Sequence, residues 1–219
     1  MLSQSIQDYL KTIYKLQQDG QVSTTKIAKT LNISGASVTG MLKRLSAMKL
    51  VDYHSYKGVK LTEDGNKLAL EILRHHRLLE LYLKESLGFS LAKVHDEACR
   101  LEHYVSEEFV EKIDTLLGFP EFSPLGNPIP TKEGLIPTRD IHPLNEITPP
   151  VKVTIAQLND ADGEMLDYFE KMNLLPKTKI EVREKAPFNG PITIYYGGEE
   201  KILGNEIAKN IFVSLNGEA

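Results

Sequence analysis

The sequence is poor in cysteine: Cys99 is the single one among 219 residues. One cysteine cannot form a disulfide within the chain, so we expect a reducing, cytoplasmic location. No apolar run approaches the ~20 residues that a membrane-spanning helix needs, and the first residues, MLSQSIQDYLKT, do not read as a signal peptide. The sequence also lacks a Walker loop, an HExxH zinc motif and a dinucleotide-binding glycine motif.

Acidic residues are scarce in the first 62 positions. Three Asp residues stand there against nine Lys or Arg, so this segment carries +6, whereas the whole chain carries −4 and the remainder therefore −10. A basic segment on an acidic body is typical of a module that binds a polyanion such as nucleic acid. A solvated set of lysines is the other interpretation, and charge alone does not separate the two.

The apolar periodicity of this basic segment predicts helices over 4–18, 25–31 and 34–48, then short strands over 51–54 and 59–61. This order is the winged helix-turn-helix pattern, whose third helix enters the major groove of DNA. A small helical subdomain with a chance hairpin is the alternative. We expect the DNA contacts to come from Thr24, Thr25, Lys26, Ser34, Ala36, Ser37, Thr39, Gly40, Lys43, Arg44 and Lys57.

The rest of the chain changes character twice. Residues 62–118 are predicted to be helical throughout, and their high apolar content favours dimerisation. Eight of the eleven prolines fall in 119–150, which excludes regular helix and central strand there. The later segment alternates like a small β-barrel, with strands over 151–158, 178–182, 192–196 and 211–215 and a short helix over 163–172. The predicted domains are 1–62 (DNA binding), 63–122 (helical metal binding and dimerisation), 123–150 (proline-rich linker) and 151–219 (β-barrel).

One helix, predicted to run from 90 to 104, carries a set of metal-ligand side chains. Cys99, Glu102 and His103 are spaced i, i+3 and i+4, which places them on one helical face. Thiolate, carboxylate and imidazole together form a transition-metal ligand set. His76 and Glu80 form an i, i+4 pair on the preceding helix, and with His95 they predict a second site. The alternatives are that Cys99 is a small buried apolar residue, or that Cys99 and a histidine form a nucleophile pair, for which no oxyanion hole is evident.

Three segments resemble one known family. HHRLLE (75–80), KVHDEACRLEH (93–103) and SPLGNPIP (123–130) resemble the diphtheria-toxin-repressor family of metal-dependent transcriptional repressors, which includes iron-dependent and manganese-transport regulators. The resemblance covers essentially the whole chain. It implies a mainly helical protein with some β-structure: a winged helix-turn-helix domain, a helical dimerisation domain and a C-terminal SH3-like (FeoA-like) barrel.

The resemblance also implies two metal sites. The primary ligands would be Asp8, Cys99, Glu102 and His103, a hybrid in which Asp8 matches the manganese regulators and Cys99 the iron repressors. Lys11 stands where the manganese regulators have an acidic ligand. The ancillary ligands would be His76, Glu80 and His95, with Asp160 or Glu164 from the C-terminal domain.

A thiolate favours Fe(II), Co(II), Ni(II) or Zn(II), and a carboxylate suits Mn(II) and Fe(II). We therefore expect Fe(II), with Mn(II) as the alternative and Co(II), Ni(II) or Zn(II) as substitutes in vitro. The expected partners are double-stranded operator DNA and a second copy of the chain, with no membrane. The expected function is repression of metal-uptake genes at palindromic operators, not enzymatic catalysis. A winged-helix regulator that ignores metals, with Cys99 as a redox sensor or core residue, is the alternative.

Overall fold

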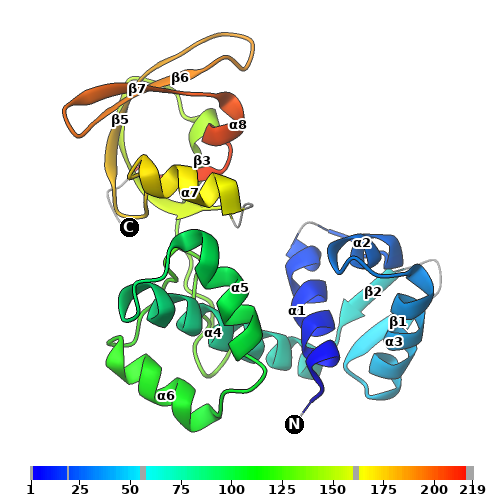
Figure 1. Cartoon of the computed structure of the whole chain (residues 1–219). Coiled ribbons are helices and arrows are strands. Elements are labelled where there is room, and N and C mark those ends of the chain that lie inside the picture. Colours follow the sequence, from blue (N-terminus) through cyan, green and yellow to red (C-terminus); the bar gives the residue numbers. More distant parts are fainter. Residues whose placement is uncertain (1, 19, 55–57, 160–162, 216–219) are drawn as a thin grey trace. The chain divides into compact units, whose positions relative to one another are not determined.

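The computed structural model describes residues 2–18, 20–54, 58–159 and 163–215 (Figure 1). The chain divides into two compact units, and the long helix α4 (Glu63–Glu85) begins in one and ends in the other. None of the described helices is both long enough and apolar enough to cross a membrane. The first unit comprises Met1–His76, Glu102–Val105 and Pro130–Leu135; the second comprises Arg77–Leu101, Ser106–Ile129 and Ile136–Ala219.

The first unit confirms the predicted winged helix-turn-helix. Its hairpin strands pair antiparallel, with Val51 opposite Leu61 and His54 opposite Gly58. Leu10 and Ile13 from the first helix are fully buried in one core with Val38, Leu42 and Leu45 from the third. The elements are α1 (Gln4–Gln18), α2 (Thr24–Thr30), α3 (Gly35–Ala47), β1 (Val51–His54), β2 (Gly58–Leu61) and the start of α4.

Serine caps fix where the second and third helices begin. The Ser23 hydroxyl accepts a hydrogen bond from the Lys26 amide at 3.1 Å, and the Ser34 hydroxyl accepts one from the Ser37 amide at 3.2 Å. Each cap satisfies an amide that the helix itself leaves without an acceptor. The start of α3 is therefore held rigidly at its exposed end.

The start of α4 is locked against the end of α3 by Gly65. A Cβ atom at this position would lie 1.9 Å from the Leu50 carbonyl oxygen, so only glycine fits. Thr62 supports the same junction, because its amide donates to Leu50 O at 3.1 Å and its hydroxyl donates to Lys49 O at 2.8 Å. This junction sets the direction of the helix that carries His76.

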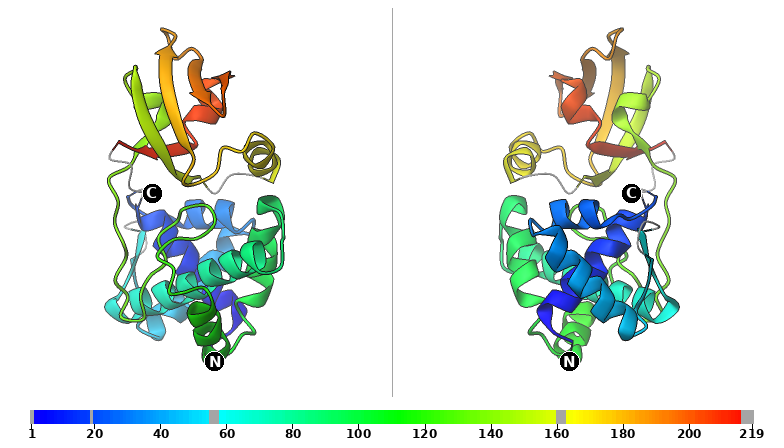
Figure 2. Two further views of the ribbon diagram at one scale, coloured as in Figure 1. Left: turned by 90° about the vertical axis from the view of Figure 1, so that its left-hand side faces the viewer. Right: turned by 90° about the vertical axis from the view of Figure 1, so that its right-hand side faces the viewer.

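The second unit combines helices with a six-stranded antiparallel sheet in the order β3-β8-β4-β5-β6-β7. Both views in Figure 2 show the sheet curled, with α7 lying beside it. The strands are β3 (His142–Pro143), β4 (Val151–Leu158), β5 (Lys179–Lys185), β6 (Ile192–Tyr196), β7 (Glu199–Leu203) and β8 (Ile211–Ser214). The helices are the end of α4, α5 (Leu91–Leu101), α6 (Glu107–Leu116), the 3-10 helix η1 (Leu144–Glu146), α7 (Gly163–Lys171) and α8 (Asn205–Ala208).

Within this unit, the segment 123–130 is packed onto the sheet. Leu125 is fully buried in the core of the C-terminal domain, and its carbonyl accepts a hydrogen bond from the Leu158 amide at 2.8 Å. Gly126 has φ +80°, and a Cβ there would lie 2.0 Å from Ala156 O. These contacts make SPLGNPIP an ordered turn.

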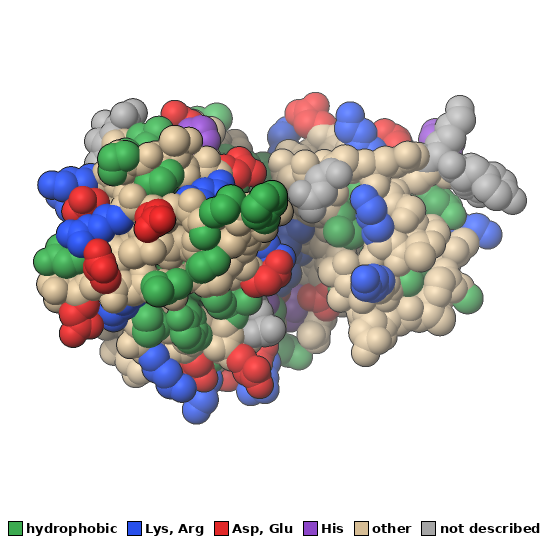
Figure 3. Space-filling model, turned by 90° about the horizontal axis from the view of Figure 1, so that it is seen from above, with side chains coloured by type: hydrophobic (Ala, Val, Ile, Leu, Met, Phe, Trp, Pro, Cys, Tyr) green, Lys and Arg blue, Asp and Glu red, His purple; other side chains and the backbone are tan. Residues whose placement is uncertain are grey.

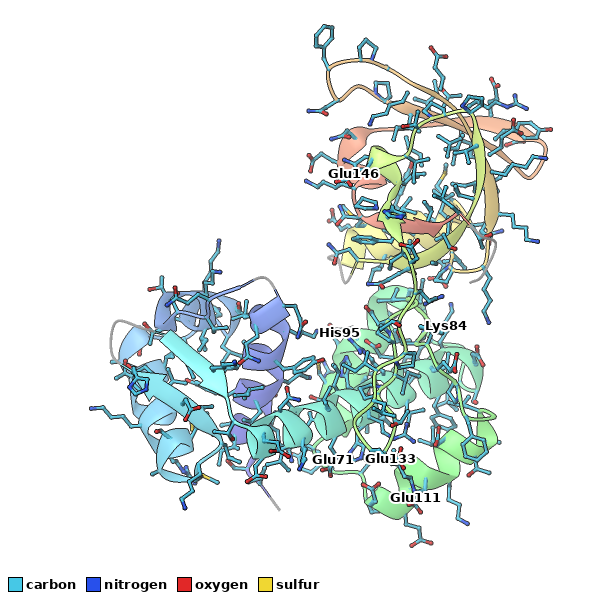
Figure 4. The ribbon with its side chains drawn as sticks, turned by 180° about the vertical axis from the view of Figure 1, so that it is seen from behind. Glu71, Lys84, His95, Glu111, Glu133 and Glu146 are labelled. Atoms are coloured by element: carbon cyan, nitrogen blue, oxygen red, sulfur yellow. The ribbon has the colours of Figure 1, made fainter. Side chains whose placement is uncertain are left out.

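The C-terminal domain is also joined to the helices of this unit through Glu170 on α7. The Glu170 carboxylate forms an ion pair with Lys84 at the end of α4, and its second oxygen accepts from the Leu91 amide at 3.1 Å. Figure 4 labels Lys84 where α4 approaches this domain. One carboxylate therefore both pairs a lysine and caps the first turn of α5.

Candidate metal centre and nucleic-acid interface

The predicted single helix over 90–104 is wrong in its last turn. The helix α5 ends at Leu101, and residues 102–104 form a turn. A continuous helix through this region is also excluded further on, because Ser106 is the N-cap of α6 and has extended backbone (φ −82°, ψ 156°). Glu102 and His103 therefore do not share a helical face with Cys99, as the i, i+3, i+4 spacing had predicted.

In the first unit, the turn brings Glu102 and His103 to Asp8 on α1. His103 Nε2 lies 3.3 Å from Asp8 Oδ1 and 3.4 Å from Glu102 Oε1. One donor atom from each of the three residues falls within 4.8 Å of the other two. Both histidine and glutamate are buried, whereas the Asp8 side chain is one-third exposed. Glu102 and His103 follow Asp8 by 94 and 95 positions in the sequence, and the fold brings all three into one cluster.

A hydrogen bond orients the His103 ring. Its Nδ1 lies 2.5 Å from Gln7 Oε1, and because a carbonyl oxygen only accepts, Nδ1 carries the proton. Nε2 then faces the Asp8 and Glu102 carboxylates. A metal-binding histidine usually donates its other ring N–H to an acceptor, which fixes the orientation of the ring. The Gln7 hydrogen bond does this here and leaves Nε2 as the atom that would bind an ion.

The Glu102 carboxylate is held ionised by its neighbours. Burial acts to raise the pKa of Glu102, but hydrogen bonds and charge from His76 and Lys11 outweigh it and the pKa is lowered. His76 Nδ1 lies 2.7 Å from Glu102 Oε2, and the Lys11 ammonium forms an ion pair with Glu102 Oε1. For Asp8, burial is the largest effect and raises the pKa, although His103 and Lys11 oppose it.

The chemistry and spacing of this cluster fit a divalent metal ion. Ligand atoms that surround an ion at right angles and ~2.1 Å lie ~3 Å apart, close to the 3.3 and 3.4 Å separations around His103 Nε2. Two carboxylates and one imidazole suit Mn(II), Fe(II) or Zn(II). The sequence had supplied all three of these residues, but Asp8 only through the family resemblance.

A second group of polar side chains lies in the other unit. His95 Nδ1 is 3.1 Å from Glu80 Oε1, and Cys99 Sγ is 3.7 Å from His95 Nε2 (His95 is labelled in Figure 4). Of the other expected ancillary ligands, His76 contacts Glu102, as described above, and Glu164 is exposed at the start of α7. Asp160 lies outside the described residues.

Most of the expected DNA-contacting residues are exposed on α2, at the N-cap of α3 and on α3. At the start of α3, the Ser34 and Ser37 hydroxyls lie 2.9 Å apart. The half-buried Thr39 donates through its hydroxyl to Gly35 O at 2.9 Å, and Thr24 is also half-buried. Lys57 lies outside the described residues. The exposed positions are Thr25, Lys26, Ser34, Ala36, Ser37, Gly40, Lys43 and Arg44.

The exposed start of α3 is composed of small side chains, with Lys43 and Arg44 about two turns further along. A surface of this kind allows close approach to base edges while the cations contact phosphates. On the face that Figure 3 shows, the Lys and Arg side chains of the first unit stand apart from one another. Separate cations along a surface suit successive phosphates.

Two polar residues at the metal cluster were missed as partners from the sequence. Gln7, next to Asp8, orients His103, and Lys11, three residues after Asp8, contacts Glu102. The i, i+3 spacing of Asp8 and Lys11 on α1 was a usable signal for Lys11, whereas the adjacent Gln7 had no such signal. Glu170 was also missed, and nothing in the local sequence of α7 distinguishes it from a solvated glutamate.

The sequence matches three domain models. Residues 1–59 match the iron dependent repressor N-terminal DNA binding domain, residues 62–131 the iron dependent repressor metal binding and dimerisation domain, and residues 142–215 the FeoA domain. The chain is 32% identical to the diphtheria toxin repressor of Corynebacterium diphtheriae over 216 residues, 93% of each chain. It is 32% identical to the iron-dependent repressor IdeR of Mycobacterium tuberculosis over 221 residues, 94% of each.

Solved structures give the same result. A manganese-dependent transcriptional repressor in complex with manganese has a TM-score of 0.87 and 35% identity, over 96% of this chain and 99% of that one. ScaR with bound Cd²⁺ has a TM-score of 0.79 and 32% identity, over 95% and 98%. The resemblance inferred from the sequence motifs is therefore confirmed. The chain belongs to the iron-dependent repressor family and is a metal-dependent transcriptional repressor.

Proposed function

We propose that Fe(II), in preference to Mn(II), activates this repressor by binding to Asp8, Cys99, Glu102 and His103. The observation that carries the proposal is the convergence of Asp8 with Glu102 and His103, with His103 Nε2 facing both carboxylates. Cys99 completes the ligand set implied by the family, and its thiolate favours Fe(II) over Mn(II). This chain is similar both to an iron-dependent repressor and to a manganese-dependent repressor.

The metal would act by joining α1 to the turn that follows α5. Asp8 is on α1, whereas Glu102 and His103 belong to that turn, so an ion bound to all three favours the arrangement in which they meet. A ligand shifts a conformational equilibrium only through its different affinities for the two states. A chain with α1 displaced binds the ion poorly, because it lacks the Asp8 ligand.

With the metal bound, the chain would bind DNA as a homodimer. Two α3 helices in a dimer contact successive major grooves of a palindromic operator, about 34 Å apart. The matched metal binding and dimerisation model covers residues 62–131. The regulated genes would be those for metal uptake. The protein would act in the cytoplasm, as a regulator with no enzymatic role. The proposed ancillary site would use Glu80 and His95, with His76, Asp160 and Glu164.

The test is operator binding by the full chain under anaerobic conditions, with Fe(II), Mn(II), Co(II), Ni(II) or Zn(II) and a chelator control. We expect a metal to raise operator affinity at least a hundredfold, with Fe(II) effective at the lowest concentration. Glu102→Ala should lose this response, whereas Glu108→Ala, at an exposed position on α6, should keep it. Equal operator affinity in chelator and in metal would overturn the proposal and favour a metal-independent regulator with Cys99 as a redox sensor.

A further inference from the structure

We propose that Lys11 is an internal counter-cation that sets the metal affinity of the primary site. In the metal-free chain its ammonium forms an ion pair with the Glu102 carboxylate, and a metal ion that binds there must displace it. The inference rests on the proposed function, because it assumes that Asp8, Glu102 and His103 bind the ion.

Lys11 lies on α1 close to Asp8, and its side chain is largely buried. It follows Asp8 by three positions on α1, so both side chains project from the same helical face. The Lys11 side chain is 11% exposed and the Glu102 side chain is fully buried, and the two form an ion pair at Oε1. His76 Nδ1 lies 2.7 Å from the other carboxylate oxygen, Oε2. Both oxygens of this metal-ligand carboxylate are therefore engaged by the protein itself.

The charges show why Lys11 weakens metal binding. Counting only Asp8, Glu102 and Lys11, the two carboxylates carry −2, and Lys11 reduces this to −1 before any metal arrives. A divalent ion then brings the group to +1, whereas without Lys11 it would bring the group to zero. Repulsion between an ammonium and a metal ion is weakly screened at a site from which water is largely excluded. Lys11 and the metal also compete for the same oxygen atom.

The same pairing explains why a lysine is useful here. A buried carboxylate without a cation is costly, and removing one partner of a buried pair is strongly destabilising. Lys11 therefore stabilises the metal-free chain and makes metal binding an exchange of one cation for another. The metal concentration needed for binding is then higher than the two carboxylates and the imidazole alone would require.

The experiment titrates the full chain with Mn(II), following the electron paramagnetic resonance signal of the free ion, and measures thermal unfolding of the metal-free protein. We expect Lys11→Gln to bind Mn(II) at least tenfold more tightly, or about 1.4 kcal/mol, and to unfold at a lower temperature without metal. Lys11→Arg keeps the charge and should stay within threefold of the wild type. Lys15→Gln removes an exposed charge from the same helix and should also leave the affinity unchanged. Unchanged or weaker Mn(II) binding by a folded Lys11→Gln chain would overturn the inference.

If Lys11→Gln does not fold, Lys11→Met preserves the apolar stem and serves instead. Two further variants separate this inference from the proposed function. Glu102→Gln should lose Mn(II) affinity by itself; if it does not, the proposed primary site is wrong whatever Lys11 does. Adding Lys11→Gln to Glu102→Gln should give a clearly smaller gain, because only the repulsion between the ammonium and the metal ion is then removed. The full gain in that background as well would show that Lys11 acts through its charge alone, and would overturn the exchange at Glu102.

Discussion

His76 Nδ1 lies 2.7 Å from Glu102 Oε2, which links α4 to the turn after α5 in the first unit. The imidazole and the Lys11 ammonium together explain how a fully buried carboxylate stays ionised without a metal. This arrangement makes the metal-free cluster sensitive to acid, in a direction that follows from the pKa of Glu102.

The Glu102 pKa is lowered from 4.5 in the folded chain. A lowered pKa contributes stability that is present above the unfolded value and is lost as the pH falls through the folded value. We therefore expect Glu102→Gln to reduce the free energy of unfolding of the metal-free chain at pH 7, and to reduce it less and less below pH 4.5. Urea unfolding at a series of pH values measures this difference, and a difference that stayed constant from pH 7 to pH 3 would contradict the expectation.

Asp8 should behave in the opposite way, because burial raises the pKa of its carboxyl group. A raised pKa means that ionisation at neutral pH opposes folding. We expect Asp8→Asn to stabilise the metal-free chain slightly at pH 7 while removing the rise in unfolding temperature that Mn(II) produces. Calorimetry with and without Mn(II) provides the measurement. A variant that kept the full Mn(II)-induced rise would show that Asp8 is not a ligand.

Gly65→Ala should be strongly destabilising, because the new methyl group would lie 1.9 Å from Leu50 O and the backbone between α3 and β1 would have to move. We expect a loss of about 2–4 kcal/mol of unfolding free energy. Gly40→Ala is the matched control, since nothing lies within 4 Å of its added Cβ and alanine favours helix by ~1 kcal/mol. Chemical denaturation compares the two, and equal effects would refute the packing argument.

Glu170→Ala should loosen the start of α5, because the Leu91 amide loses its acceptor and Lys84 loses its partner. We expect faster hydrogen exchange in the first turn of α5 and a loss of about 1–2 kcal/mol. Lys171→Ala, an exposed neighbour, should leave both unchanged. Hydrogen exchange is measured by mass spectrometry on the peptides covering 88–95. Equal exchange rates in Glu170→Ala and Lys171→Ala would contradict the expectation.

Ser37→Glu should reduce operator affinity by at least a hundredfold, because a carboxylate at the exposed start of α3 would face DNA phosphates. Binding by the wild type should weaken steeply with salt, since Lys43 and Arg44 displace counterions. Ser86→Glu adds the same charge at an exposed position after α4 and serves as the control. Full operator affinity in Ser37→Glu would show that this helix does not enter the major groove.

Much of the fold followed from local patterns. The serine caps and the apolar stripe of α3, with Val38, Leu42 and Leu45 inward, predicted the winged helix-turn-helix, because periodicity and capping are properties of the segment itself. The strand β7 and the short helix α8 were not predicted. Two adjacent glutamates begin β7, which is the last strand in the sheet order and mostly exposed, so it carries no apolar alternation.

The metal cluster could be predicted in composition but not in arrangement. The spacing of Cys99, Glu102 and His103 indicated one helical face, yet α5 ends at Leu101, residues 102–104 form a turn, and α6 begins after its N-cap Ser106. Asp8 joins the cluster from α1, and no local pattern reveals a contact over so many residues. Those long-range contacts depend on tertiary packing, and only the family resemblance had placed Asp8 with the others.

The hydrogen bond between Gln7 and His103 spans 96 positions, and the Lys11–Glu102 pair spans 91. A metal ion bound beside them is in effect a reversible cross-link over a loop of this length. A permanent cross-link around a 100-residue loop removes ~4.7 kcal/mol of chain entropy from the unfolded state. The ion that switches on DNA binding would therefore also protect the chain from unfolding and from proteases. When the ion becomes scarce, release from the operator and faster turnover of the protein would follow from the same event.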